Sequence, residues 1–183
     1  MMKVFTNERQ YDLGACAIAL GTFDGVHIGH QALIHRAMEL AREMGAASVV
    51  YTFDRHPLSV LAPARAPREL LTLEQKLHKL EELGVDGVLV KPFTAEFAAM
   101  DPTAYLELLA RDLRARAIVA GFNYTFGAMG RGNAALIQSE AARLGYRAEI
   151  VDAVTDGEDT VSSTLIRRLQ DRGEIARAER LMR

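Results

Sequence analysis

GTFDGVHIGH, residues 21 to 30, lies between a short apolar run that ends at Leu20 and an amphipathic stretch that begins at Gln31. This order predicts a β-strand, a glycine-rich turn and the start of a helix. In open α/β sheets ligands bind beyond the carboxyl ends of the strands, and a helix N-terminus carries unpaired N–H groups that attract phosphate. The segment is therefore expected to bind a phosphate group.

The rest of the chain repeats this alternation of short apolar runs and stretches with helical spacing. The expected strands are 15–20, 48–53, 86–90, 117–120 and 147–151, and the expected helices are 31–44, 73–83, 102–114 and 133–144. Strands that alternate with crossover helices predict a Rossmann-like α/β fold. We expect an open, mainly parallel sheet of five or six strands with helices on both faces, plus C-terminal helices. Gly45, Gly84 and Gly145 each follow a helical stretch, where a left-handed residue commonly ends the helix.

The composition is that of one globular domain. A chain of 183 residues, 49% of them apolar, predicts a single domain over residues 1–183. The net charge of −2 and the lack of a basic run argue against a nucleic-acid partner. Cys16 lies alone in an apolar run, which predicts a buried thiol and excludes a disulfide framework. No signal peptide or bilayer-length apolar run is present, so we expect a cytoplasmic protein with no membrane partner. The sequence leaves the oligomeric state open.

His27 and His30 are three residues apart, so at a helix start both side chains would project from one face. Two imidazoles placed in this way reach the same phosphate group. The alternative is a glycine-rich turn in which the histidines only cap or pack. Zinc would need a third ligand, which only His35 offers nearby, and we expect no metal site formed by the protein.

Three further segments carry polar or aromatic side chains where strands end or a helix begins. YTFDRHPLSVL, residues 51 to 61, places a histidine after the second expected strand. GFNYTFGAMGRGN, residues 121 to 133, gathers aromatic rings that would stack on a planar ligand or pack in the core. VSSTLIRR, residues 161 to 168, offers hydroxyl N-caps for a helix. The irregular loop at residues 62 to 68 is either a mobile flap or an ordinary connection.

An arginine in the last of these segments has an unusual expected position. Arg167 would lie in the first turn of its helix, against the helix dipole. That placement is favourable if an anion occupies the helix start. The alternative is a solvated surface arginine.

GTFDGVHIGH resembles the HxGH signature of the nucleotidyltransferase superfamily and, in full, the FAD synthetase (FMN adenylyltransferase) module of bacterial bifunctional riboflavin kinase/FAD synthetases. The three further segments resemble the family's other motifs and occur in the same order. Arg55, Asn123 and Leu165 depart from the family pattern. The resemblance extends from about Ala15 to the C-terminus, where residues 172–183 resemble the connector to a riboflavin kinase domain. It implies FAD synthesis without that kinase domain.

The resemblance implies a reaction and a set of site residues. The FMN phosphate would attack the α-phosphorus of ATP directly and in line, giving FAD and pyrophosphate, with Mg²⁺ arriving on ATP. The implied catalytic residues are His27, His30 and Arg167. The implied ATP-binding residues are Gly21, Phe23, Asp24, Gly25, Gly29, Ser163 and Thr164. The implied FMN-binding residues are Phe53, His56, Pro57, Asn123, Phe126 and Gly127.

We expect the two histidines to be neutral before ATP binds, because a helix N-terminus disfavours imidazolium. Two other functions stay open. One is an adenylyl- or cytidylyltransferase with another phosphorylated acceptor, and the other is a non-catalytic sensor that binds flavin or nucleotide.

Overall fold

A single parallel sheet organises the chain, whose residues 1–183 are all described by the computed structural model. Its strands lie in the order β1-β4-β3-β2-β5-β6, and every neighbouring pair is parallel. Their bounds are β1 Lys3–Phe5, β2 Cys16–Leu20, β3 Ala47–Phe53, β4 Gly87–Lys91, β5 Ala115–Gly121 and β6 Arg147–Val151. The predicted α/β class and strand number are confirmed.

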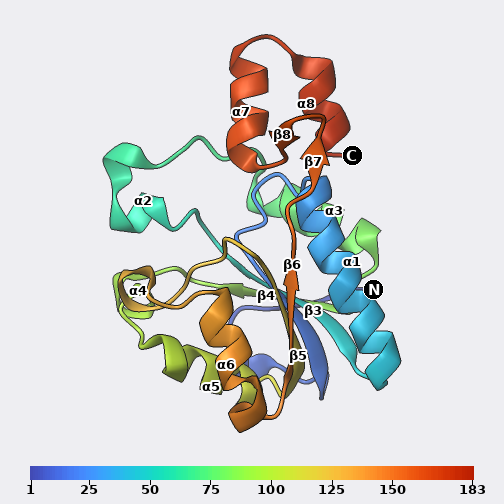
Figure 1. The fold of residues 1–183 in the computed structure, drawn as a ribbon, viewed down its shortest axis with the longest axis vertical. Coiled ribbons are helices and arrows are strands. Elements are labelled where there is room, and N and C mark those ends of the chain that lie inside the picture. Colours follow the sequence, from blue (N-terminus) through green and yellow to red (C-terminus); the bar gives the residue numbers. More distant parts are fainter.

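Helices cover both faces of this sheet (Figure 1). The longer ones are α1 Ile28–Met44, α3 Leu73–Leu83, α5 Pro102–Arg111 and α6 Ala134–Leu144. Short helices α2 Leu58–Leu61 and α4 Ala95–Ala98 and the 3₁₀ turns Glu8–Gln10, Pro63–Arg65 and Ala128–Gly130 lie in connections. The chain closes with the hairpin β7 Thr155–Asp156 and β8 Asp159–Thr160, followed by α7 Ser163–Asp171 and α8 Ile175–Leu181.

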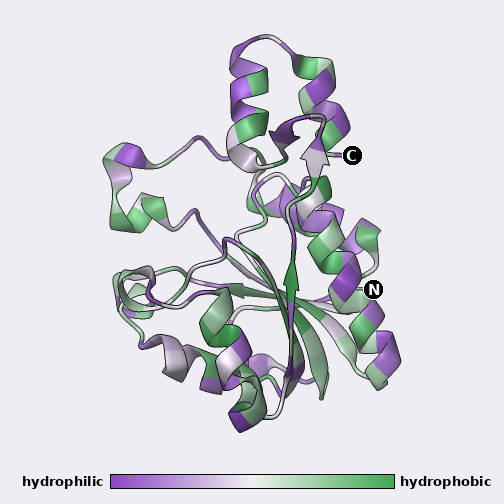
Figure 2. Ribbon diagram, in the orientation of Figure 1, coloured by the Kyte–Doolittle hydropathy of each residue, from purple (hydrophilic) through white to green (hydrophobic).

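The side chains of β2 alternate between the two hydrophobic cores. Ile18 and Leu20 join the core under α5 and α6, whereas Ala17 and Ala19 join the core under α1 and α3. All of β2 is buried, which explains why it appears in the sequence as a continuous apolar run. Figure 2 shows the same arrangement, with hydrophobic strands inside and mixed helices around them.

The strand order creates a topological switch point between β2 and β5. The chain runs outward from β2 through β3 to β4 and then returns to form β5 on the other side of β2. The loops that follow β2 and β5 therefore leave in opposite directions and open a crevice at the carboxyl ends of the strands. GTFDGVHIGH and GFNYTFGAMGRGN are these two loops.

Most differences from the expected elements occur at helix ends. α1 begins at Ile28 rather than residue 31, because His27 caps it. α5 ends at Arg111 rather than residue 114, where Arg114 takes the left-handed conformation with φ of 52°. The three expected glycines do end helices in that conformation.

Cys16 is buried as expected, and its thiol donates to the Leu113 carbonyl at 3.2 Å. No helix is long and apolar enough to cross a membrane.

Candidate active site

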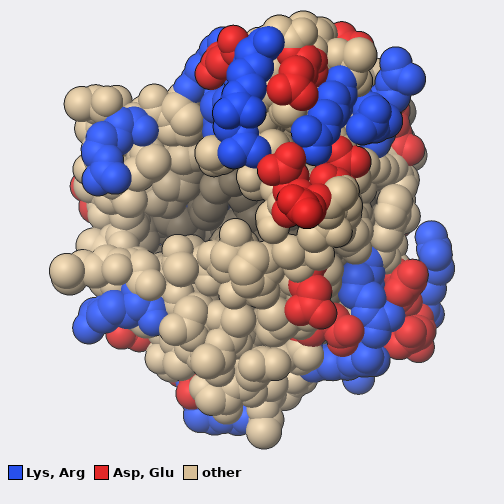
Figure 3. Space-filling model, turned by 45° about the horizontal axis from the view of Figure 1, so that its top comes forward, with Lys and Arg blue, Asp and Glu red and all other residues tan.

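A large cavity lies beyond the carboxyl ends of the strands. Its volume is about 1060 Å³, and Figure 3 shows it as a hollow with Lys and Arg gathered beside it on the side of the C-terminal helices. All but three of the predicted site residues line it. The predicted residues that line the cavity are Gly21, His27, Gly29, His30, Phe53, His56, Pro57, Asn123, Phe126, Gly127, Ser163, Thr164 and Arg167.

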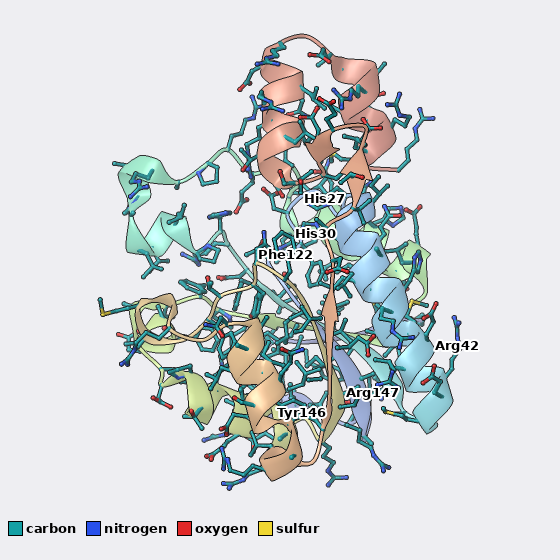
Figure 4. All side chains as sticks on the ribbon, viewed as in Figure 1. His27, His30, Arg42, Phe122, Tyr146 and Arg147 are labelled. Atoms are coloured by element: carbon teal, nitrogen blue, oxygen red, sulfur yellow. The ribbon has the colours of Figure 1, made fainter.

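The imidazole rings of His27 and His30 stack on each other at the start of α1. Their centroids are 3.6 Å apart and the rings are 17° from parallel. His27 is the N-cap residue, and its Nδ1 accepts a hydrogen bond from the His30 backbone N–H at 3.2 Å. Figure 4 shows both rings near Phe122, which comes from the loop after β5. The cap fixes the orientation of the His27 ring at the cavity wall.

The geometry also fixes the protonation of this pair. Because His27 Nδ1 is an acceptor, the neutral ring carries its proton on Nε2, which is left to donate to a ligand. Burial lowers the pKa of His27 from 6.5 to about 4. Burial, with the neighbouring His27, also holds the pKa of His30 well below its usual value, and Nδ1 of His30 has no partner. The neutral state predicted from the sequence is confirmed, although burial is its main cause.

Gly29 allows the stacked rings to come this close to the helix backbone. A Cβ at Gly29 would lie 3.2 Å from His27 Nδ1 and 3.6 Å from the Val161 carbonyl. The first distance is tighter than ordinary packing. Glycine at this position therefore serves the placement of His27 and the approach of the residue 161 segment.

Phe23 and Gly25, predicted to shape the ATP pocket, lie in the turn but do not line the cavity. Phe23 is fully buried and meets the edge of the His30 ring, with centroids 5.2 Å apart. Phe23 and Val26 both have positive φ, 49° and 43°, which costs on the order of 1–3 kcal/mol per residue. Both side chains are buried, and their packing offsets this strain. The turn thus holds His30 in place through the packing of Phe23 against its ring.

Two helix N-termini border the same cavity. At α7, Ser162 caps the helix by accepting from the Leu165 amide at 3.1 Å, which leaves the Ser163 and Thr164 amides without an intrahelical acceptor. The first amides of α1 at Ile28 and Gly29 are in the same situation. Two positive dipole ends facing one cavity favour a polyanionic ligand there.

Arg167 lies one turn further into α7 than predicted. It is the fifth residue of the helix because Ser162, rather than Ser163 or Thr164, is the cap. The anion that it contacts is Asp24, predicted to bind ATP, whose carboxylate receives a bond from Arg167 Nη2. Asp24 lies outside the cavity lining, whereas Arg167 lines it.

An aromatic wall closes the side of the cavity away from α7. Five rings follow one another with centroids 5.0 to 5.8 Å apart, and all five line the cavity. They are Phe53, Phe93, Phe97, Tyr105 and Phe126. Phe126 is buried, whereas Phe122 at the same cavity is 51% exposed and has no aromatic partner. Such a wall suits a flat, largely apolar ring system.

Charged side chains are few inside the cavity. Arg65 and Arg167 are its only Lys or Arg residues, and Asp152 is its only acidic residue. No three His, Cys, Asp or Glu residues are grouped closely enough to hold a metal ion.

The sequence comparison decides the family. The model of the family described as FAD synthetase matches residues 9–165. The chain belongs to the FAD synthetase family. The match contains the turn after β2 and the loop after β5, and it ends two residues before Arg167.

Known proteins of this family and fold extend the likeness. The chain is 40% identical over 166 residues to the bifunctional riboflavin kinase/FMN adenylyltransferase of Listeria monocytogenes, covering 90% of this chain and 52% of that protein. It thus spans about half the length of this relative and of those from Bacillus subtilis and Escherichia coli. A crystal structure of a macrolide-efflux protein from Streptococcus pneumoniae shares the fold at 27% identity and a TM-score of 0.83, covering 99% of this chain and 59% of that one. A pantoate-beta-alanine ligase from Francisella tularensis shares the fold alone, at 15% identity and a TM-score of 0.56, over 97% of this chain and 80% of the ligase.

Sequence reasoning missed two segments of this FAD synthetase site. Residues 93–100 after β4 and 151–154 after β6 contribute a large part of the cavity wall. Both follow the carboxyl end of a parallel strand, which was the available signal. Apart from Asp152, the residues of these segments that line the cavity are small or apolar, so they gave no chemical signal in the sequence.

Lys76 was also missed. Its ammonium donates to the carbonyls of Thr22 and Phe53, each at 3.1 Å, and so joins the chain just beyond β2 to the end of β3. Burial lowers its pKa. A lysine within an amphipathic helix gives no sign in the sequence that it is buried.

Proposed function

We propose that this chain transfers the adenylyl group of ATP to FMN, giving FAD and pyrophosphate. The observation that carries the proposal is one cavity bordered by two open helix N-termini, a stacked neutral histidine pair and an aromatic wall. The helix N-termini and the histidine pair suit a polyphosphate, and the aromatic wall suits a flavin. Membership of the FAD synthetase family supports the same pair of substrates.

The reaction is a direct in-line attack by an FMN phosphate oxygen on the α-phosphorus of ATP. A phosphate monoester has a second pKa of about 6 and is already largely ionised near neutral pH, so no general base is required. Positioning and charge stabilisation provide the catalysis. This agrees with a cavity whose only carboxylate is Asp152.

The proposal gives each phosphate-binding residue a role that its geometry supports. His27 donates from Nε2 to the phosphates, and His30 lies against it in the same stack. The amides of Ser163 and Thr164 at the start of α7, with Arg167, hold the leaving pyrophosphate. Gly21 and Gly29 leave room for the nucleotide.

The flavin is bound at the aromatic side of the cavity. Phe53 and Phe126 belong to the wall, and His56, Pro57, Asn123 and Gly127 line the space around it. Asn123 has an amide rather than a carboxylate, so it orients the ligand by hydrogen bonds without taking a proton. Mg²⁺ is expected to arrive with the phosphates of ATP, whose charge it offsets.

Acceptor choice separates this function from its nearest alternatives. The protein would be incubated with ATP and, in turn, FMN, riboflavin, nicotinamide mononucleotide, phosphopantetheine or glycerol phosphate, with pyrophosphate release as the readout. FMN alone is expected to support release, and riboflavin is not, because it lacks the attacking phosphate. Turnover with another acceptor instead would show a different transferase, and flavin binding without any release would show a sensor.

A further inference from the structure

Asp24 is buried and joins its own turn to two other segments of the chain. Its Oδ1 accepts from the Leu70 amide at 2.8 Å, and its Oδ2 accepts from Arg167 Nη2. The Asp24 carbonyl also accepts from the Ser163 hydroxyl at 2.7 Å. The turn after β2, the end of the β3–α3 connection and the start of α7 therefore meet at Asp24.

Arg167 completes this junction from the other side. Its Nε donates to the Arg68 carbonyl at 2.6 Å, while its Nη2 contacts Asp24. The two side chains are only 15% and 9% exposed. Separating a pair this well buried is costly, because each charge would be left uncompensated. The two side chains are therefore expected to keep this geometry.

The connection held by these bonds forms one wall of the cavity. It spans residues 54–72 between β3 and α3, and Leu58, Leu61, Arg65 and Pro67 within it line the cavity. Figure 1 shows this connection, with α2, extending away from the sheet and returning beside α7. Bonds from Arg167 and to Asp24 hold its returning end at residues 68 and 70.

We propose that Asp24 is a positioning residue: it holds Arg167 at the cavity wall and links that arginine to the returning end of the 54–72 connection. The proposal rests on the proposed adenylyl transfer. A guanidinium has five N–H donors, and Asp24 and Arg68 occupy two of them. Three donors remain for phosphate oxygens, in a direction that the two protein bonds have fixed.

The test compares four variants in steady-state kinetics with ATP and FMN. In Asp24→Asn, the side-chain oxygen can still accept from Leu70, but an amide cannot replace the carboxylate opposite Arg167. Arg167→Met removes the residue that Asp24 positions, and the double variant closes a cycle. Glu107→Gln is the matched control, because it breaks a pair with Arg143 at 2.9 Å that lies away from the cavity.

Asp24→Asn is expected to lower kcat/KM for ATP by about 10- to 100-fold while KM for FMN changes by less than about twofold. In the Arg167→Met background it is expected to cause no further loss, since the arginine is already absent. Glu107→Gln should behave as wild type. If the losses multiply in the double variant, or if Asp24→Asn uses ATP as well as wild type or better, the positioning role is wrong.

A second measurement does not depend on turnover. Dissociation constants for a non-hydrolysable ATP analogue, and the rate of tryptic cleavage after Arg65 and Arg68, would be determined for the same proteins. Asp24→Asn should bind the analogue more weakly and be cleaved faster in this connection, and unchanged values would overturn the proposal. A wild-type protein that binds the analogue but makes no FAD would refute the proposed function, and these two readouts would still decide the role of Asp24.

Discussion

The ring of His27 lies flat against the ring of His30 with centroids 3.6 Å apart, and the His30 amide holds the first ring in place. In the proposed function, His27 is both the helix cap and a donor to phosphate. Burial keeps both rings neutral until a polyanion arrives. A bound polyphosphate favours imidazolium, so proton uptake is expected to accompany ATP binding.

Replacing His30 by Ala should reduce turnover by about 10²- to 10³-fold, because a preorganised donor in a buried site contributes this much to phosphoryl chemistry. The melting temperature should fall only modestly, because the variant loses the ring contacts with His27 and Phe23 but no side-chain hydrogen bond at Nδ1. His35→Ala is the matched control, being an exposed histidine on the same helix. Near-normal FAD formation by His30→Ala would show that the pair is structural.

Stability should depend on pH through His27. Its pKa is 6.5 when unfolded and about 4 when folded, so between these values the unfolded chain binds a proton that the folded chain does not. The free energy of unfolding therefore falls as the pH falls through this window, by as much as about 3 kcal/mol from His27.

Urea unfolding from pH 4 to 7.5 would measure this dependence. His27→Asn is the comparison, because asparagine is also a good N-cap and does not titrate. The two stability curves should diverge below about pH 6.5. Parallel curves would mean that His27 is not held neutral by the fold.

Gly29→Ala tests the close approach of the histidine ring. The added Cβ would press on His27 Nδ1, and the ring would have to move from its cap position. The higher helix propensity of alanine, up to about 1 kcal/mol, would offset the cost of displacing the ring, so the free energy of unfolding should change little. A fall of about tenfold in kcat/KM with stability retained is expected, since small misplacements are costly in catalysis. Equal losses of stability and activity would point to general disruption instead.

Phe122→Ala tests the flavin side of the cavity. Phe122 is half exposed at the cavity and has no aromatic partner, so its removal should leave the fold intact. If the ring contacts the flavin, KM for FMN should rise about tenfold while KM for ATP stays within about twofold. Ile175→Ala on α8, another exposed apolar residue, is the control. A change in KM for ATP alone would assign Phe122 to the nucleotide.

The sequence predicted the central strand β2 well because burial on both faces makes it a continuous apolar run. β2 and β6 were placed within one residue, and α3 was placed at its observed ends. β1 was missed because Lys3–Phe5 is only three residues long and exposes Val4 at the sheet edge. A run so short has no period to detect.

The sequence indicated which segments line the cavity where chemistry was visible, but not the contacts that only the fold creates. The N-termini of α1 and α7 could be located because glycine-rich turns and hydroxyl caps have sequence signatures. The bond between Asp24 and Arg167 joins residues 143 positions apart, and no local pattern reports it. The same holds for Lys76, whose buried partners are backbone carbonyls.

The most direct test follows the α-phosphorus of ATP through one turnover. Enzyme in excess would be mixed with FMN and ATP labelled at the α-phosphate, quenched over time, and separated into FAD, nucleotides and protein. Direct adenylyl transfer predicts that the label passes from ATP to FAD at the rate at which unlabelled pyrophosphate appears, with none on the protein. Label that is trapped on the protein, or that leaves as AMP or ADP without FAD, would contradict the proposed reaction.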